Sequence, residues 1–313
     1  MYIRKKILFL LPLIFSLSVL SSDIEEIIVK GEYREKSLGE EDSSIVVIQS
    51  EQIKSQAIKH FQQLSHLVPN LNYAASDSRA RYFQIRGIGE RSGYQGTPNS
   101  SVGFLIDDID YSGQGGIATL FDVDQVEVFR GPQGSRSGAN ALAGLIYIKT
   151  KDPTEKFEGT SELTLGDYGT QNIGIAFGGP MQNKKLKYRL VLRTDYADGF
   201  RKNIYLNKSD TSKKDELTLR YKLNWELNET TNLDFLISKV DMDDPADIWT
   251  IDGSLNTLSD RPGMDSQNTN SYGIKITKDF SNFTVQSLTS ATKTDVIFSL
   301  SLIHISEPTR HSA

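Results

Sequence analysis

The sequence predicts an α+β domain followed by the first strands of an antiparallel transmembrane β-barrel. Residues 44–152 combine one helical pattern with short apolar strands that are separated by glycine-rich turns. From residue 157 the pattern changes to runs of about ten residues in which apolar and polar side chains alternate. The connections between these runs are alternately short and long, which is typical of a membrane barrel.

The composition excludes several classes of protein. The 313 residues are 38% hydrophobic, which is too low for several membrane-spanning helices but suits barrel strands with one apolar face. A net charge of −5 argues against a nucleic-acid partner. Cysteine is absent, residues 131–138 lack the lysine of a phosphate-binding loop, and no nucleophile-elbow motif is present. We therefore expect no enzymatic activity, no cofactor and no metal site.

Residues 1–21 have the pattern of a secretory signal peptide. Arg4, Lys5 and Lys6 form a positive region, which is followed by an apolar run over residues 7–20 and by small side chains around Ser21. The alternative is a membrane anchor helix. The run is shorter than the roughly 20 residues that a membrane span needs, and this favours the signal peptide.

The segment 22–43 is acidic and contains one apolar island, residues 27–29, which Lys30 and Gly31 follow. A short β-prone strip in a polar segment suits strand addition to the sheet edge of a partner, in which main-chain hydrogen bonds provide the affinity. The alternative is an unstructured N-terminal segment with an incidental apolar triplet. The segment taken without its context favours this alternative.

Residues 44–152 are expected to form the α+β domain. Ser50 is expected to cap a helix with apolar side chains at helical spacing, namely Ile53, Ala57, Ile58, Phe61 and Leu64. Short strands are expected at 45–48, 83–86, 102–106, 126–129 and 145–149. The glycine- and serine-rich stretch 87–116 would form long loops, which usually provide a working surface. His60 and His66 show no partner pattern and are expected at the surface.

Residues 157–299 are expected to supply about seven barrel strands. In one run, Leu190 and Leu192 alternate with Arg189 and Arg193, which directs apolar side chains to lipid and charged side chains to a wet lumen. Short turns are expected at 181–184 and 228–231, and long loops at 199–212 and 243–267. A soluble β-sandwich is the alternative, but its strands usually run about five or six residues and its core holds no water for a charged face.

Several motifs, in this order and spacing, resemble the TonB-dependent outer-membrane receptors. EEIIVKG at 25–31 looks like the TonB box region, the strip that pairs with the periplasmic energy-coupling protein TonB. QIRGIG at 84–89 and VGFLIDDI at 102–109 look like two motifs of the plug domain. VEVFRGPQG at 126–134 and GANALAGLIYI at 138–148 are similar to the signature that closes the plug. With the turn GDYG at 166–169, the resemblance covers residues 23–299.

The sequence departs from the usual family pattern at three places. Gln125 stands where the family usually has arginine, Arg136-Ser137-Gly138 where it has leucine-tyrosine-glycine, and Ala143-Gly144 where it has two glycines. The glycine-dependent turns stay feasible. These departures leave the subfamily, and hence the ligand, open.

The resemblance implies a barrel of about 22 strands, whose wide lumen the α+β domain (44–152) fills as a plug with polar contacts. It implies a monomeric receptor in the bacterial outer membrane, surrounded by outer-membrane lipid. The receptor would take up a scarce nutrient actively, such as a ferric siderophore or a similar metal chelate, with cobalamin, haem and oligosaccharides left open. A passive porin or adhesin is the alternative. TonB would pair with the box residues Glu26, Ile27, Ile28, Val29, Lys30 and Gly31.

The resemblance also implies a lock between plug and barrel. Arg86 and Arg130 match two family arginines that form charge clusters with barrel glutamates on later strands, and the alternative is two ordinary solvated charges. Ligand contacts are expected from plug loops that mix aromatic, amide and cationic groups, and the alternative is a merely polar loop. The candidates are Arg91, Tyr94, Gln95, Asn99, Tyr111 and Gln114.

Two further stretches require an interpretation. Asp107, Asp108 and Asp110 could bind Ca²⁺, but their alternation with apolar residues favours a strand edge that runs into a turn. The stretch 300–310 resembles the translation of a sequencing-library adapter and ends the strand pattern abruptly. We therefore expect residues 300–313 to be a non-native tail, and we assign no function to its two histidines.

Overall fold

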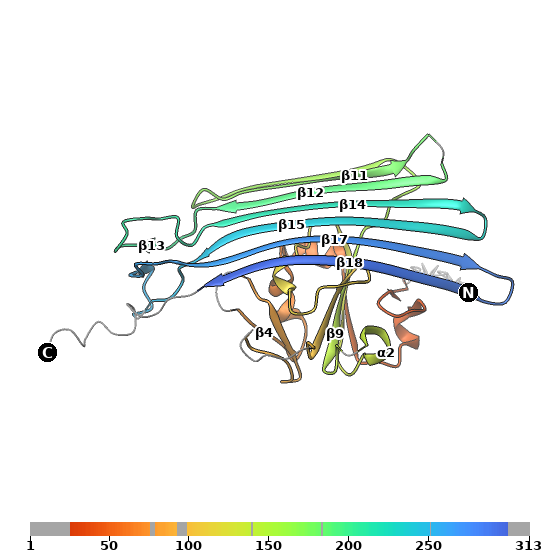
Figure 1. Ribbon diagram of the computed structural model, residues 1–313, viewed down its shortest axis with the longest axis horizontal. Coiled ribbons are helices and arrows are strands. Elements are labelled where there is room, and N and C mark those ends of the chain that lie inside the picture. The colour runs from red at the N-terminus through yellow and green to blue at the C-terminus, as the bar shows by residue number, and fades with distance from the viewer. Residues whose placement is uncertain are drawn as a thin grey trace, which may run out of the picture.

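The computed structural model describes residues 26–75, 79–92, 99–138, 140–182, 184–250 and 252–299. The expected signal peptide (1–21) and the expected non-native tail (300–313) lie outside these residues. In Figure 1 a curved sheet of long strands lies across a smaller α+β domain. None of the described helices is both long enough and apolar enough to cross a membrane.

The α+β domain, called the plug below, is built on a five-stranded sheet of order β3-β8-β9-β6-β7. Its strands are β3 (Ile45–Gln49), β8 (Val123–Phe129), β9 (Gly144–Thr150), β6 (Val102–Ile106) and β7 (Ile109–Asp110). β6 and β9 are parallel, and the other neighbours are antiparallel. Four of these strands, β3, β6, β8 and β9, match predicted strands within a few residues at each end. The fifth predicted strand is β5 (Tyr82–Ile85), which lies outside this sheet and pairs with β4 (Leu71–Ala74).

Short elements surround this sheet. They are β1 (Ile28–Val29), β2 (Lys36–Ser37), η1 (Leu38–Glu40), α1 (Ser50–Ser55), η2 (Phe61–Leu67), η4 (Gly115–Ile117) and α2 (Gly134–Ser137).

The helix predicted from Ser50 to Leu64 is wrong in its length. α1 ends at Ser55 because Ala57 adopts the left-handed conformation (φ 52°), and the N–H of Ile58 bonds back to the carbonyl of Ile53 at 3.0 Å. This is the hydrogen bond of a Schellman helix end. The chain then runs extended to His60, whose ring caps η2. Ile53, Ile58, Phe61 and Leu64 are buried, whereas Ala57 is exposed. The helical spacing therefore predicted burial at four of the five positions, but not the continuity of the helix.

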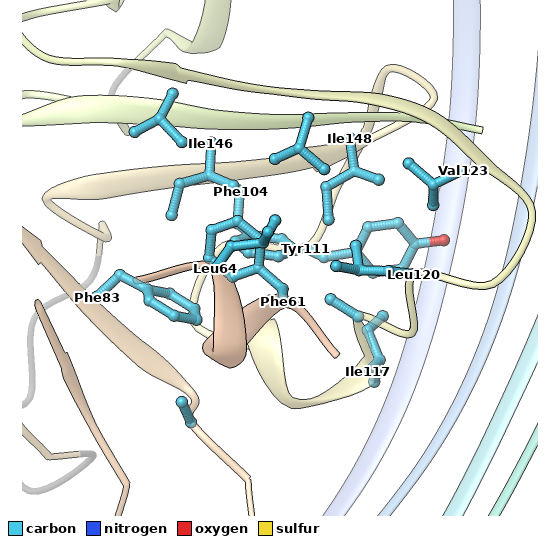
Figure 2. Packing of buried hydrophobic residues seen from close by; sticks show 14 of the residues in the cluster. Phe61, Leu64, Phe83, Phe104, Tyr111, Ile117, Leu120, Val123, Ile146 and Ile148 are labelled. Atoms are coloured by element: carbon cyan, nitrogen blue, oxygen red, sulfur yellow. The ribbon is translucent and has the colours of Figure 1, made fainter. Parts of the chain in front are cut away.

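An aromatic cluster forms the centre of the plug core (Figure 2). Phe61 is fully buried and meets Phe83 and Phe104 edge-on, with ring centroids 5.0 and 5.3 Å apart. Phe83 and Phe104 are stacked at 5.6 Å. These rings join η2, β5 and β6, three elements that hardly share main-chain hydrogen bonds, so their packing holds the domain together.

The second domain, called the barrel wall below, is an antiparallel sheet. It has seven strands among the described residues, which is the number predicted from the sequence. Its strands are β10 (Glu158–Leu165), β11 (Gln171–Pro180), β12 (Leu186–Ala197), β14 (Lys214–Asn228), β15 (Thr231–Ala246), β17 (Gly263–Asp279) and β18 (Thr284–Ser299). The predicted alternation is confirmed: Arg189 and Arg193 are 3% and 1% exposed and face the plug, whereas Leu190 between them is 37% exposed.

The predicted short turns and long loops lie at opposite ends of the sheet, and the connection of β10 to β11 (166–170) is a short turn at the end that carries the long loops (Figure 1). The two long connections carry β13 (Lys202–Asn203) and β16 (Asn256–Thr257), which pair in parallel. The buried carboxylate of Asp247 accepts from the Asn203 amide at 2.9 Å and from the Thr257 and Ser259 hydroxyls at 2.7 Å each. These bonds join the two long loops into one unit.

Replacing Phe61 by alanine should destabilise the plug by about 3–5 kcal/mol, because it opens a cavity at the centre of the aromatic cluster. The measurement is urea unfolding followed by protease resistance of the plug. Leu142→Ala is the matched control: Leu142 is 69% exposed, so its loss should change stability by less than about 0.5 kcal/mol. Equal effects of the two substitutions would contradict the assigned core.

Candidate partner-binding segment and the interface between plug and barrel wall

The segment that resembles the TonB box is docked on the plug. Its strand β1 pairs only with β2, over two residues, and does not extend the plug sheet. Beyond β1, the main-chain N–H groups of Lys30 and Gly31 donate to the two carboxylate oxygens of Glu127, at 2.7 and 2.8 Å. Two adjacent N–H groups are therefore satisfied by a single side chain of β8.

The carbonyl groups of the same segment are also bound by side chains. The Ile28 carbonyl accepts from the Gln125 amide at 2.9 Å, and the Gly31 carbonyl accepts from Arg136 Nε at 2.8 Å. Gln125 and Arg136 are two of the positions at which the sequence departs from the family pattern. Four main-chain groups of segment 28–31 are thus bound to side chains of the plug.

Apolar packing reinforces this docking. Val29 is fully buried on the face of the sheet opposite to the aromatic cluster, where it joins Leu105, Phe129, Ala141, Leu145 and Tyr147. A Cβ atom on Gly31 would lie 2.7 Å from Phe129 Cε2 and 2.8 Å from Glu127 Oε2. Gly31 is therefore needed for close approach, not for an unusual φ.

Glu127 is fully buried beneath the segment. Burial raises the pKa of this carboxyl, against the opposing effect of the N–H groups of Lys30 and Gly31 and of the Gln125 amide. A side ion pair adds to the docking, since Lys30 Nζ lies 2.7 Å from Asp124 Oδ2 with both side chains partly exposed. Exposed pairs of this kind contribute little, so the main-chain bonds to Glu127 matter more.

Ion pairs join the plug to the barrel wall. On the long-connection side, Arg79 of the plug pairs with Glu216 at 2.6 Å, and Arg81 pairs with Asp265. Asp122 pairs with Arg189 of β12, and the side chains of both are almost fully buried. The plug therefore presents cations near one end of the wall and carboxylates along the rest of it.

The turn between β6 and β7 carries the largest charge cluster. Asp107 and Asp108 occupy its two central positions with φ of 47° and 70°, which is the backbone of a tight hairpin turn. Lys222 of the wall reaches Asp107 at 2.9 Å, and Lys149 lies 3.8 Å away. The aspartates thus lie at a strand edge that runs into a turn, as predicted.

These lysines lower the pKa of Asp107. Burial acts to raise the pKa of Asp107, but Lys222 and Lys149 outweigh it, so the pKa lies below its usual value. The pKa of Asp152, which also contacts Lys222 at 3.0 Å, is lowered in the same way. A cavity of 360 Å³ lies beside this cluster, lined by residues that include Lys30 of the docked segment and Lys275 of β17.

The contact between plug and wall is not purely polar, which corrects the expectation from the sequence. Leu236, Val240 and Met242 of β15 are buried in the same cluster as the plug core. Ile109 of the plug lies over Gly273 of β17, where an added Cβ would approach its Cδ1 to 3.2 Å. The wall therefore offers an apolar patch between its charged positions.

Neither of the two predicted lock arginines forms an ion pair with a carboxylate that the structure describes. The Arg86 side chain is exposed on a residue with φ 54°. Arg130 Nε is buried and has no hydrogen-bond partner among the residues that the structure describes. The lock stays a prediction, because its expected partners belong to further barrel strands.

The predicted ligand residues are only partly brought together. Arg91 and Asn99 are exposed, and Tyr94 and Gln95 lie outside the described residues. Gln114 accepts a hydrogen bond at 2.7 Å from Thr294 of β18, toward the long-connection end. Tyr111 is 3% exposed against the wall, where burial raises its pKa to about 12. Tyr111 thus packs at the interface, and we leave it out of the ligand surface.

His60 is buried, which corrects the surface position expected for it. Its Nε2 lies 2.9 Å from the Gly116 carbonyl, and its Nδ1 accepts from the Gln62 N–H at 3.3 Å. Burial, with Arg79 nearby, lowers its pKa well below the usual value, so the ring stays neutral. Glu127, Gln125 and Arg136 were not predicted as contacts of the segment, and the departures from the family pattern at 125 and 136 were the available signal.

Comparison with known proteins identifies the domain. A family model of the TonB-dependent receptor plug domain matches residues 37–145. The pesticin receptor of Yersinia pestis is 25% identical over 192 residues, which are 61% of this chain and 28% of that protein. The vitamin B12 transporter BtuB of Vibrio vulnificus is 25% identical over 158 residues, 46% of this chain and 26% of that protein. The chain thus spans about a quarter of the length of these relatives.

The architecture matches solved receptors. The ferric yersiniabactin uptake receptor FyuA from Yersinia pestis has a TM-score of 0.71 at 20% identity, over 80% of this chain and 41% of that chain. The ferripyoverdine receptor of the outer membrane of Pseudomonas aeruginosa has a TM-score of 0.67 at 18% identity, over 87% of this chain and 37% of that chain. At such identities the likeness shows the fold alone, a plug against a barrel wall.

The Asp107 cluster predicts a stability that depends on pH. The folded pKa of Asp107 is lowered, so its contribution is complete above its unfolded pKa of about 4 and is lost as the pH falls through the folded pKa. Asp107→Asn should cost about 2 kcal/mol at pH 7, the typical value of a hydrogen bond to a charged group. The measurement is the thermal midpoint of the plug between pH 7 and pH 3.

The substituted protein should also lose less stability on acidification than the parent. Asp210→Asn, on an exposed residue of a long connection, is the control and should follow the parent curve. Parallel curves for Asp107→Asn and the parent would show that Asp107 does not anchor the plug.

Proposed function

This chain comprises the plug and part of the barrel of a TonB-dependent receptor of the bacterial outer membrane, and on that premise we propose that it serves active uptake of a scarce nutrient. The observation that carries the proposal is the docked segment 28–31, whose main-chain groups are bound by side chains and can be transferred to a partner. The proposed ligand is a ferric siderophore or a similar metal chelate. Two structurally similar proteins are receptors for ferric yersiniabactin and ferripyoverdine, and they support this class of ligand.

The proposed mechanism breaks no bond in the ligand. Ligand binding at the long-connection end shifts the plug, which frees the segment of residues 26–31 at the other end. TonB then adds this segment as a strand to its own sheet and pulls, using energy from the inner-membrane proton gradient. The ion pairs between plug and wall suit such movement, since buried pairs define geometry more than they add stability.

We also propose that the exposed plug loops with Arg91 and Asn99 face the ligand, and that Arg86 and Arg130 bind carboxylates of further barrel strands. The buried, unpaired Nε of Arg130 among the described residues supports the second proposal. A buried N–H group without an acceptor is costly, and a carboxylate from the remaining wall would offset that cost.

Deleting residues 26–31 should abolish uptake but leave binding of the ligand to cells unchanged, because the segment contacts the plug and not the ligand loops. The measurement is uptake and surface binding of a radiolabelled ferric siderophore, with the receptor expressed in cells that lack other receptors. Val29→Pro should have the same effect through loss of one main-chain donor and of strand conformation.

A matched control is Glu229→Pro in the exposed turn between β14 and β15, at the same end of the wall. It should leave uptake intact. Undiminished uptake without residues 26–31, or uptake that survives collapse of the proton gradient, would support a passive porin and exclude the proposal.

A further inference from the structure

Arg136 stands at the centre of a chain of contacts from the docked segment to the barrel wall. Its Nε donates to the Gly31 carbonyl at 2.8 Å, and its Nη2 pairs with a carboxylate oxygen of Asp108. The other oxygen of Asp108 lies 3.4 Å from Lys275 Nζ on β17. Only 7% of the Arg136 side chain is exposed, so these contacts are largely shielded from water.

Aromatic rings fix the plane of the guanidinium. Arg136 Cζ lies 4.6 Å from the ring centre of Tyr33, which belongs to the N-terminal segment, and 5.9 Å from that of Tyr147 on β9. The Tyr33 hydroxyl also donates to the Arg136 carbonyl at 3.3 Å. A planar guanidinium can stack and donate in two directions at once, which lysine cannot do.

Asp108 connects Arg136 to the opposite end of the plug. It lies in the turn of the hairpin formed by β6 and β7, and this hairpin continues to Gln114, which is bound to Thr294 of the wall at 2.7 Å. The turn lies near the short-turn end of the sheet, and Gln114 toward the long-connection end. A displacement of the hairpin at one end is thereby carried to Asp108 at the other.

We propose that Arg136 is a positioning residue that ties release of segment 28–31 to the position of the β6–β7 turn. The inference rests on the proposed function and adds to it the regulation of the same segment. The N–H groups of Lys30 and Gly31 each have one hydrogen, which is donated to Glu127, and Val29 is buried, so the docked state excludes pairing with a strand of the partner. Movement of Asp108 away from Lys275 draws Arg136 with it and removes its bond to Gly31.

This connection depends on a residue at which the chain departs from the resembled pattern. Arg136 stands where receptors of the resembled pattern usually have leucine, and leucine offers no donor to the Gly31 carbonyl or to Asp108. Restoring leucine therefore removes the connection while keeping a residue that suits the fold. The substitution Arg136→Leu is accordingly the central test.

The experiment measures exposure of the segment by thiol labelling, and none of the 313 residues of this chain is a cysteine that would compete for the label. Val29→Cys is labelled with a maleimide in the receptor as inserted in isolated outer membranes, with no TonB present. Labelling should be slow in the parent, because Val29 is fully buried. It should be roughly tenfold faster with Arg136→Leu, the effect expected from loss of a charged donor, and similarly faster with Asp108→Asn.

Two controls separate release from general loosening. Arg34→Leu removes a cation from an exposed position just beyond segment 28–31 and should leave the labelling rate unchanged. Glu229→Cys reports on the exposed turn between β14 and β15 and should label equally fast in every background. Protease resistance of the plug checks folding. If Arg136→Leu fails that check, Arg136→Lys is used instead. Lysine keeps the charge but lacks the planar fork that reaches both Gly31 and Asp108, so an intermediate rate is expected.

The proposal is overturned if Arg136→Leu and Arg136→Lys label within twofold of the parent, or if Arg34→Leu accelerates labelling as much as Arg136→Leu. Binding of the isolated C-terminal domain of TonB to the same membranes is measured separately. Faster labelling without any TonB binding would leave the role of Arg136 standing and refute the proposed function. If TonB binds all variants equally and the labelling rate is unchanged, the role of Arg136 is refuted and the proposed function stands.

Discussion

Charge pairing between plug and barrel wall is the constraint on which the rest of the structure depends. A strand that crosses a membrane must send its apolar side chains to lipid, so alternation sends the intervening charged side chains inward. On β12 and β14 these inward residues include Arg189 and Lys222, and the plug covers both. A covered charge needs a partner, and the plug provides Asp122 and Asp107 at the required places. The positions of the plug carboxylates therefore follow from the pattern of the wall.

The apolar patch on β15 limits how far the plug can move away from the wall. Leu236, Val240 and Met242 are buried against the plug, so complete withdrawal of the plug would expose apolar surface on both sides. The aromatic cluster of the plug, by contrast, is closed within the domain (Figure 2). Small displacements that keep the patch covered and exchange ion pairs are therefore less costly than extraction of the whole domain.

The sequence predicted those parts of the structure that depend on periodicity. Alternation over long runs predicted the wall strands and the inward direction of Arg189 and Arg193, because one side of every strand faces lipid. The predicted helix over 50–64 ends before Ala57, where a non-glycine residue adopts the left-handed conformation of a Schellman helix end without a glycine to signal it. The surface position predicted for His60 was wrong because its burial depends on a contact with the carbonyl of Gly116, 56 residues away along the chain.

The contacts of the docked segment could not be predicted in the same way. Glu127 lies within a strand in which apolar and polar residues mix, and nothing local indicates that its carboxylate binds two main-chain N–H groups 96 and 97 residues earlier. Main-chain recognition is largely independent of side chains, so the segment carries few sequence requirements. Only Val29, through burial, and Gly31, through close approach to Phe129, are restricted by their surroundings. Recognition by a partner strand would impose the same weak requirements, because both states use the same N–H and carbonyl groups. The short apolar strip in a polar segment, ambiguous by itself, is thus what a segment with two alternative main-chain partners requires.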